Sequence, residues 1–358
     1  MRICLVAGGT GGHIAPAVAV LEKIKEDKFF ITSKTRISEK RFIKDLEEKN
    51  LEFINVKPIV GKGLRSISGF FSAVSALQES FRILKKINPD IVIGFGGYVS
   101  GPVCLAGRIL KKKVYIHEQN SVMGFTNKIL SLFCDKIFVS FDKTEAPSYA
   151  QRKFVYTGFP LRNKFKEDLE RGIDAKQSQN SYKICVFVSG GSQGAVGLNK
   201  IFVEAIERIE KNLNDLKSKL KIIHQTGDMF FEKARDFFSS WDANVFPFTD
   251  EFGFYLGLSD IAIARGGAGT VFEIAYARKP ALFVPLPRSA GNHQEKNPKY
   301  LLGDACFIIR QNEKHKFEIN FYDLLTNEKL RQELESKLRN IQVEDGSFRI
   351  LGFIRESG

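Results

Sequence analysis

Four clusters of glycine, each following a short apolar run, limit what this chain can fold into. They lie at Gly8–Gly12, Gly96–Gly101, Gly190–Gly194 and Gly266–Gly269. Glycine lets backbone N–H groups approach an anion closely, and a helix that begins there adds partial positive charge. One such loop is ordinary in a tight turn. Four of them, two in each half of the chain, predict two phosphorylated ligands that meet in one cleft.

The apolar runs alternate with helix-length amphipathic segments, which predicts parallel sheets covered by helices on both faces. The fold class expected is therefore α/β and doubly wound. In the first half the predicted strands are Ile3–Val6, Phe29–Thr32, Glu52–Val56, Ile91–Phe95, Val114–His117, Lys136–Val139 and Phe154–Tyr156. In the second half they are Lys183–Val188, Lys221–Gln225, Asn244–Phe246, Ile261–Ala264 and Ala281–Val284.

The length of 358 residues suits two domains. The run "KICVFVSGG" at Lys183 repeats the pattern of "RICLVAGG" at Arg2, so each half is expected to begin its own sheet. The polar stretch 169–182 is the candidate surface segment near the boundary. We therefore expect domains at 1–160 and 161–358, with the last helix able to pack back on the first domain. A ligand would bind where the carboxyl ends of the strands meet.

Charge and cysteine content narrow the class of protein. The net charge of +13 suggests a polyanionic neighbour, or a compositional bias of the source. No basic helix or aromatic-basic sheet signature supports nucleic acid. The five cysteines have no paired spacing, which predicts buried thiols rather than zinc ligands or disulfides. No signal peptide is expected, and the uncharged stretch 91–107 holds five glycines, which predicts a strand, a loop and a helix rather than a membrane span.

Neither the Gly8–Gly12 cluster nor the Gly190–Gly194 cluster matches the dinucleotide-binding fingerprint. After Gly9 and Gly11, the third glycine of G-x-G-x-x-G is replaced by Ile14, and the next strand does not end in an acid. The second copy, "GGSQGA", also fails this spacing and the P-loop pattern. A nicotinamide enzyme and a P-loop nucleotidase are therefore disfavoured.

Three side chains near these loops are candidates for chemistry. His13 would open a helix, where the helix dipole keeps the imidazole neutral and able to act as a base. Glu273 lies about one turn after Gly269 and would either accept hydrogen bonds from a ribose or face solvent. Arg162 follows "TGFP" and would either neutralise a diphosphate or lie at the surface.

The ordered motifs "GGTGGH", "FGGYVSGP", "HEQNSVMGFTNK", "TGFPLR", "GGSQGA" and "RGGAGTVFEIAYARKPALFVPLPRSAGNHQEKN" closely resemble the MurG family of peptidoglycan N-acetylglucosaminyltransferases. The resemblance spans Met1 to about Leu302 and implies the GT-B fold, two Rossmann-like domains facing across a cleft. It implies inverting transfer of N-acetylglucosamine from UDP-N-acetylglucosamine to the C4 hydroxyl of the muramoyl sugar of lipid I, the undecaprenyl-pyrophosphoryl-MurNAc-pentapeptide. The products would be lipid II and UDP, and no cofactor or metal is expected.

The resemblance also assigns residues. It implies His13 as the catalytic base and Gly96, Gly97 and Tyr98 as the acceptor diphosphate site. Donor contacts would come from Thr10, Gly11, Gly12, Asn120, Arg162, Ser192, Thr249, Ala268, Gly269, Thr270, Val271, Phe272, Glu273 and Gln294. The chain departs from the family at Phe159, where asparagine is usual, and at Gly266, where the usual "RSGA" hydroxyl is missing.

A lipid acceptor predicts a membrane face. Apolar residues at helical spacing around Phe70 and Phe71, flanked by lysines and arginines, suit either the core or anionic inner-membrane lipids. The resemblance implies a peripheral protein on the cytoplasmic face of the bacterial inner membrane. We expect Phe70 and Phe71 to be partly exposed there.

Two other classes of function stay open at this point. A UDP-N-acetylglucosamine epimerase or a glycolipid glycosyltransferase would share the fold and the donor loops but change the acceptor loops. A binding module on the same fold would be expected to lack His13, Glu273 or Gln294, and this chain has all three.

Overall fold

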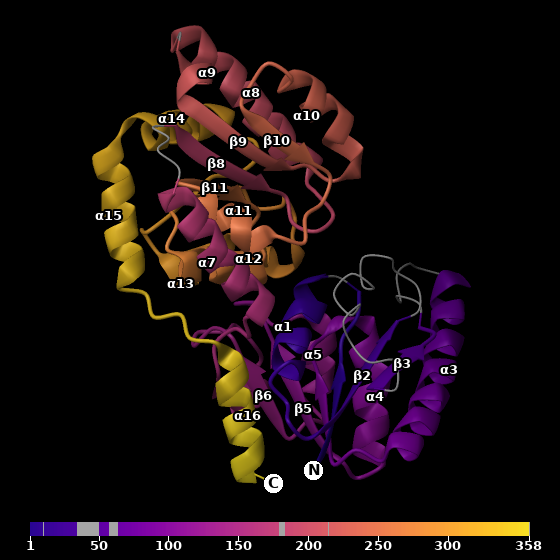
Figure 1. Cartoon of the computed structure of the whole chain (residues 1–358). Helices are drawn as coiled ribbons and strands as arrows, with labels where there is room; N and C mark the ends of the chain where they lie inside the picture. Colours follow the sequence, from indigo (N-terminus) through magenta and orange to yellow (C-terminus); the bar gives the residue numbers. More distant parts are fainter. Residues whose placement is uncertain (10, 34–49, 57–63, 179–182, 214, 358) are drawn as a thin grey trace. The chain divides into compact units, whose positions relative to one another are not determined.

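The computed structural model describes residues 1–9, 11–33, 50–56, 64–178, 183–213 and 215–357, with the backbone alone for 64–73. The chain forms two compact units. The first contains Met1–Arg162 and Glu344–Gly358, and the second contains Asn163–Val343. Figure 1 shows both units.

The first unit is built on a parallel sheet of seven strands in the order β3-β2-β1-β4-β5-β6-β7. Its strands are β1 (Arg2–Val6), β2 (Asp27–Ser33), β3 (Leu51–Ile54), β4 (Ile91–Gly94), β5 (Lys113–Glu118), β6 (Lys136–Val139) and β7 (Phe154–Tyr156). The central strand β1 pairs Leu5 with Phe30 of β2 and with Ile93 of β4. The strand order reverses direction between β1 and β4, because β2 and β4 lie on opposite sides of β1.

Helices cover both faces of this sheet, as the alternating pattern predicted. The helices are α1 (Gly11–Leu21), α3 (Leu64–Ile87), α4 (Gly97–Ile109), α5 (Phe125–Leu130), α6 (Ser148–Gln151) and α16 (Gly346–Ser357). Residues of α3, α4 and α5 share one core cluster, and residues of α1 and α16 share another. The C-terminal helix α16, yellow in Figure 1, packs beside α1 and places the Phe353 ring edge-on against Tyr115 and Phe138.

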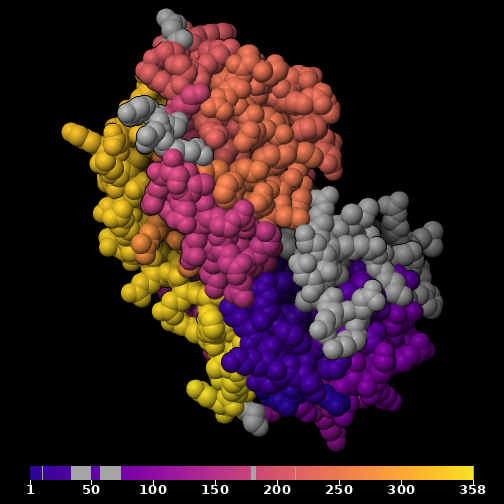
Figure 2. Space-filling view, viewed as in Figure 1, coloured from indigo at the N-terminus to yellow at the C-terminus, as the bar shows by residue number. Residues whose placement is uncertain are grey.

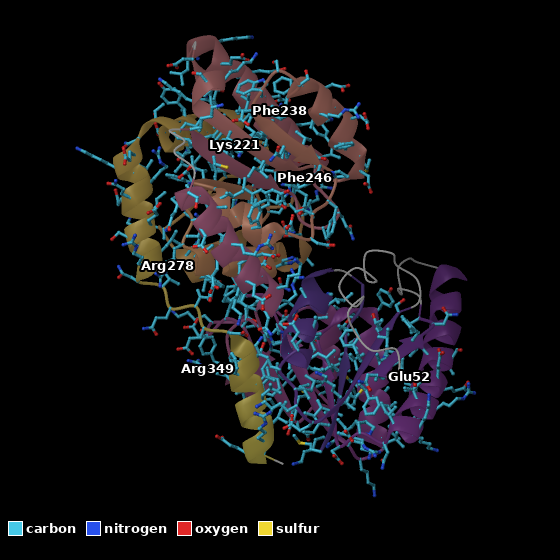
Figure 3. All side chains as sticks on the ribbon, viewed as in Figure 1. Glu52, Lys221, Phe238, Phe246, Arg278 and Arg349 are labelled. Atoms are coloured by element: carbon cyan, nitrogen blue, oxygen red, sulfur yellow. The ribbon has the colours of Figure 1, made fainter. Side chains whose placement is uncertain are left out.

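The second unit repeats this plan with six parallel strands in the order β10-β9-β8-β11-β12-β13. They are β8 (Ile184–Ser189), β9 (Leu220–Gln225), β10 (Ala243–Phe246), β11 (Ile261–Ala264), β12 (Ala281–Phe283) and β13 (Phe307–Ile308). The helices are α7 (Asn163–Gln177), α8 (Val196–Asn212), α9 (Leu216–Lys219), α10 (Phe231–Phe237), α11 (Phe252–Leu258), α12 (Ala268–Ala277), α13 (His293–Leu302), α14 (Lys314–Thr326) and α15 (Glu328–Arg339). Phe238, labelled in Figure 3, packs in its core against the rings of Phe202 and Trp241.

Helix α7 corrects the interpretation of the polar stretch 169–182. Its outer side lies at the surface, magenta in Figure 2, but its inner side packs tightly on α11. A Cβ atom at Gly172 would lie 2.1 Å from the Phe254 carbonyl oxygen, and one at Gly257 would lie 2.5 Å from that of Leu169. Because glycine has no side chain, these positions let the backbones of α7 and α11 come into contact. A contact of this kind leaves no periodic pattern of apolar residues in the sequence. Residues 179–182 lie outside the described part of the chain.

Part of the basic charge has a structural use. Lysine ammonium groups donate to the free carbonyls at helix ends, where the dipole favours positive charge. Lys28 Nζ donates to the Leu21 and Ile24 carbonyls after α1, at 3.0 and 3.1 Å. Lys279 Nζ donates to the Gly257 and Ser259 carbonyls after α11, at 3.0 and 2.7 Å, and burial lowers the pKa of Lys279 to about 8. A polyanionic partner is therefore not needed to explain every lysine.

Candidate active site

The four glycine loops fall in pairs at the point where each sheet reverses its strand order. In the first unit the loops follow β1 and β4, which are neighbours. In the second unit they follow β8 and β11, which pair Ser189 with Ala264. Ligands of doubly wound sheets bind outside the carboxyl ends of the strands at this reversal. Each unit therefore has its two candidate loops side by side at the carboxyl ends of neighbouring strands.

The two loops of the first unit pack against each other through glycine. Gly97 has φ +75°, and a Cβ atom there would lie 1.9 Å from the Gly8 carbonyl oxygen. Next to it, Tyr98 opens α4 and lies over Gly9, where a Cβ atom would be 3.4 Å from the ring. The Tyr98 hydroxyl is 3.3 Å from Ser33 Oγ at the end of β2. The structure thus brings Gly97 and Tyr98, two predicted acceptor residues, against the first loop.

His13 lies in the first turn of α1, so the prediction that it opens a helix is confirmed. Its Nδ1 atom is 3.1 Å from the Phe95 carbonyl oxygen at the end of β4 and also contacts the side-chain amide of Gln119. A Cβ atom at Gly96 would lie 2.7 Å from His13 Nδ1. Glycine at position 96 therefore leaves the space that the imidazole occupies.

A buried carboxylate shapes the loop after β5, which carries Asn120. Glu118 accepts hydrogen bonds from the Asn120 backbone N–H at 3.0 Å, the Gly124 backbone N–H at 2.9 Å and Asn127 Nδ2 at 2.8 Å. Burial raises the pKa of Glu118, and these hydrogen bonds oppose the rise. Sequence reasoning missed Glu118 and Asn127, although both lie in the quoted motif. The available signal was an acid at the end of an apolar strand.

The first glycine loop of the second unit, Gly190–Gly194, joins β8 to α8 and contains the half-buried Ser192. Gly191 has φ +84° and Gly194 has φ +72°. Gln225 Nε2 donates to the Gly191 carbonyl at 2.8 Å, and a Cβ atom at Gly194 would lie 2.4 Å from the Thr226 carbonyl oxygen. Helix α8 begins with no side-chain cap at Ala195, which suits binding of an anion by its first N–H groups.

At the start of α12, the second glycine loop of this unit, Gly266–Gly269, packs against Gln294. A Cβ atom at Gly266 would lie 1.8 Å from the Gln294 carbonyl oxygen, and Asn297 Nδ2 donates to the Gly266 carbonyl at 2.9 Å. Gln294 Oε1 accepts from the Leu286 N–H at 2.9 Å. The first turns of α12 contain the predicted donor residues Ala268, Gly269, Thr270, Val271, Phe272 and Glu273. Glu273 is half-buried on this helix.

Burial of a residue on α12 decides whether a ligand could reach its side chain or only its backbone. The side chains of Val271 and Phe272 are buried in the second unit, so any ligand there would meet their backbone groups. Helix α12 begins after Gly267 with no side-chain cap. Thr249 precedes α11, and its hydroxyl accepts from the Glu251 N–H at 3.0 Å, which leaves its backbone for the donor contact that the resemblance implies.

Arg265, at the end of β11, was not assigned a role from the sequence. Its guanidinium is buried and donates to the carbonyls of Val284 at 2.8 Å and Pro285 at 3.1 Å, and to Gln311 Oε1 at 2.7 Å. Burial lowers the pKa of Arg265 to about 10. The residue ties the ends of β11 and β12 together beneath the loop that starts α12.

The remaining predicted residues lie at the start of a helix, just before a helix, or outside the described part of the chain. Arg162 is the last residue of the first unit before α7, and Gly11 and Gly12 open α1. Thr10 and the side chains of Phe70 and Phe71 lie outside the described residues. Phe159 is buried, and its carbonyl accepts from the Gly346 N–H at 3.0 Å, a contact that does not depend on its side chain. Within the described ranges, no three or more histidine, cysteine or acidic residues gather as metal ligands.

Comparison with known proteins defines the class first. Residues 3–139 match the glycosyltransferase family 28 N-terminal domain, and residues 185–347 match the glycosyltransferase family 28 C-terminal domain. The two parallel-sheet units are those of a GT-B glycosyltransferase. The structure of MurG from Acinetobacter baumannii is 28% identical with a TM-score of 0.74, and the match covers 99% of this chain and 100% of that chain.

The curated relatives define the family. The UDP-N-acetylglucosamine--N-acetylmuramyl-(pentapeptide) pyrophosphoryl-undecaprenol N-acetylglucosamine transferase of Syntrophus aciditrophicus is 34% identical, over 95% of this chain and 94% of its own. The enzyme of the same name from Francisella philomiragia is also 34% identical, over 99% and 97%. The chain belongs to this family of N-acetylglucosamine transferases. A UDP-GlcNAc 2-epimerase from Neisseria meningitidis shares the fold, with a TM-score of 0.70 at 14% identity over 99% of this chain and 100% of its own.

Proposed function

We propose that this chain transfers N-acetylglucosamine from UDP-N-acetylglucosamine to the C4 hydroxyl of the muramoyl sugar of lipid I, giving lipid II and UDP for peptidoglycan synthesis. The observation that carries the proposal is the pairing of glycine loops at the strand-order reversal of each sheet, with His13 in the first turn of the helix that follows one loop of the first unit. The names of the curated relatives support the substrates.

The proposed reaction is a single displacement. The C4 hydroxyl oxygen of the acceptor attacks the anomeric carbon, whose bond to the diphosphate oxygen breaks, so the anomeric configuration inverts. The hydroxyl proton passes to His13, and UDP leaves with the negative charge on its diphosphate. Backbone N–H groups at the starts of α8 and α12 would stabilise that charge, because uncapped helix ends favour anions.

The binding roles divide by unit. In the second unit, Glu273 would accept hydrogen bonds from the ribose, Gln294 would read the sugar hydroxyls, and Ser192 would contact the diphosphate. In the first unit, Gly96, Gly97 and Tyr98 would hold the diphosphate of the lipid acceptor. The remaining proposed donor contacts from the first unit are Thr10, Gly11, Gly12, Asn120 and Arg162. The domain roles follow: acceptor binding for the first unit and donor binding for the second.

The test is UDP release by the purified protein, with and without a lipid I analogue. We expect release to depend on the acceptor, with UDP-N-acetylgalactosamine used poorly. An acceptor analogue that lacks only the C4 hydroxyl is the matched control and should support no transfer. Equal UDP release without acceptor would indicate a hydrolase, and conversion of the donor to a 2-epimer would indicate an epimerase. Either result would contradict the proposal.

We also propose that the protein is peripheral on the cytoplasmic face of the inner membrane and binds anionic lipids. In the part of the chain that the structure describes, no helix has the length and apolar character needed to span a bilayer. Helix α5 and the turn after it carry exposed apolar residues at helical spacing: Phe125, Ile129, Leu132 and Phe133. Basic residues lie near them in the sequence, among them Lys128 and Lys136. An apolar face with a basic surround suits an anionic lipid surface.

One face of α3 packs into the core where its side chains are described. Leu77 and Phe81 pack against the core cluster of the first unit, and Leu84 is buried within it. Val74 is exposed. Helices α3, α4 and α5 contribute to the same core cluster and so cover one face of the sheet. The proposed exposure of Phe70 and Phe71 at the membrane therefore concerns only the first turns of α3.

Replacing Ile129 with serine is expected to weaken binding to vesicles that contain anionic lipid. Ile129 is 45% exposed, so the substitution should leave the thermal unfolding temperature nearly unchanged. Ile319→Ser is the matched control, since Ile319 is 47% exposed on α14 of the second unit. Vesicle flotation with and without anionic lipid provides the measurement. Equal flotation of both variants and the unmodified protein would count against α5 as part of the membrane face.

A further inference from the structure

The surroundings of His13 constrain which ring nitrogen carries the proton. Its Nδ1 atom lies 3.1 Å from the Phe95 carbonyl oxygen, and a main-chain carbonyl can only accept a hydrogen bond. A neutral imidazole has one N–H donor and one acceptor nitrogen. The contact with Phe95 is therefore attractive only if Nδ1 carries the hydrogen. The lone pair that could accept a substrate proton is then on Nε2.

A second group reaches the same ring nitrogen. Gln119 is buried at the end of β5, and its side-chain amide contacts His13 Nδ1. In the orientation seen, the amide nitrogen faces Nδ1 and the amide oxygen is buried with no hydrogen-bond partner among the described residues. Rotating the amide by half a turn leaves its shape unchanged and places the oxygen against Nδ1–H. This orientation replaces a donor facing a donor with a hydrogen bond.

We propose that Gln119 is a positioning residue that, with the Phe95 carbonyl, holds His13 in the Nδ1–H tautomer and leaves the lone pair on Nε2. The inference deepens the proposed function and rests on it, because the position of the lone pair matters only if His13 accepts the C4 hydroxyl proton. Gly96 makes the arrangement possible, since any Cβ atom there would crowd Nδ1. Three segments distant in sequence thus meet at one ring nitrogen.

The tautomer can be measured without substrate. The chain has five histidines, so a long-range proton–nitrogen NMR spectrum of the imidazoles is simple, and the His13 signals are those missing in His13→Ala. We expect the Nδ1–H form in the unmodified protein and in Gln119→Glu, whose side chain also accepts. In Gln119→Leu we expect a mixture with the Nε2–H form. An unmodified protein in the Nε2–H form, or a Gln119→Leu spectrum unchanged at His13, would overturn the proposal.

Steady-state kinetics distinguish a positioning role of Gln119 from a purely structural one. Loss of tautomer control should lower kcat in Gln119→Leu by on the order of 10-fold, because only the molecules that keep the Nδ1–H tautomer can accept the proton; this loss is smaller than the roughly 10⁴-fold loss in a catalytic triad held in the wrong tautomer. The KM for UDP-N-acetylglucosamine should change by less than about 2-fold, because that substrate is held by other residues. Gln151→Leu, at an exposed glutamine of the same unit, is the matched control and should leave kcat unchanged.

The Gln119→Glu variant tests the direction in which the pH–rate profile moves. A carboxylate beside Nδ1–H stabilises the imidazolium, so the acid limb of the pH–rate profile should move to higher pH. The charged or titratable neighbours of His13 on β5 are His117 and Glu118. Burial and the charge of His13 lower the pKa of His117 to about 3, so His117 stays neutral. A tautomer change in Gln119→Leu with unchanged kcat would support the positioning role and contradict His13 as the base.

Discussion

Replacing His13 with alanine is expected to lower kcat for sugar transfer by on the order of 10²-fold to 10⁴-fold, the usual contribution of a positioned general base. The imidazole lies at the start of α1, where the helix dipole disfavours the imidazolium, and the Phe95 carbonyl orients it. The substitution removes the group that we propose takes the proton of the acceptor hydroxyl. The rate of UDP release in the presence of a lipid I analogue provides the measurement.

Donor binding separates loss of the base from loss of the fold. UDP-N-acetylglucosamine is expected to bind His13→Ala with affinity within about 2-fold of the unmodified protein, because the proposed ribose and sugar contacts come from Glu273 and Gln294. His315→Ala, at an exposed histidine on α14, is the matched control and should retain full turnover. If His13→Ala turns over at the normal rate, His13 is not the base.

Replacing Lys23 with methionine is expected to destabilise the first unit by about 3–5 kcal/mol, the effect of leaving one partner of a buried ion pair uncompensated. Lys23 Nζ and Asp345 Oδ2 are 3.1 Å apart, and both side chains are less than a tenth exposed. The same ammonium donates to the Leu161 carbonyl at 3.1 Å, and Asp345 Oδ1 accepts from the Leu161 N–H at 3.1 Å. The pair joins the chain where it leaves the first unit to the segment that returns to it.

Hydrogen exchange at α1 and α16 reports on this pair directly, and both helices should exchange faster in Lys23→Met. The fluorescence of Trp241, the single tryptophan, reports on the second unit and should keep its urea midpoint. Lys86→Met is the matched control, because Lys86 pairs with Glu52 at 2.7 Å but is 73% exposed, and it should cost less than about 1 kcal/mol. If both variants lose the same free energy of unfolding, burial does not make the Lys23–Asp345 pair more stabilising than an exposed pair.

The alternating pattern of the sequence predicted most of the fold. The five strands predicted at the second half appear as β8, β9, β10, β11 and β12, and each of the four glycine clusters follows a strand. Such patterns are local, because strand burial and helix starts depend on neighbouring residues. The strand β13, of two residues, was missed because so short a run carries no period. The helical part of 169–182 was missed because its buried residues in that range are Leu169 and Gly172, which are too few to give an apolar period.

The candidate site was only partly predictable for the same reason. His13 and Glu273 were predicted from their places beside glycine loops and from the resemblance to a family, and Gln294 was predicted from the resemblance alone. Glu118, Asn127 and Arg265 were not, because their roles consist of hydrogen bonds to backbone groups that folding brings near. A sequence shows that a polar residue sits in an apolar run, but it does not show which carbonyl or N–H will satisfy that residue.

The sequence by itself therefore determined two α/β units, the edges that carry their glycine loops, and the residues those loops present. Only the tertiary structure decided the state of those residues. His13 meets Phe95 and Gln119 across 82 and 106 positions of chain, and Lys23 meets Asp345, which lies in the returning C-terminal segment. Contacts between such distant residues depend on strand order and helix packing, and these are fixed when the whole core is buried.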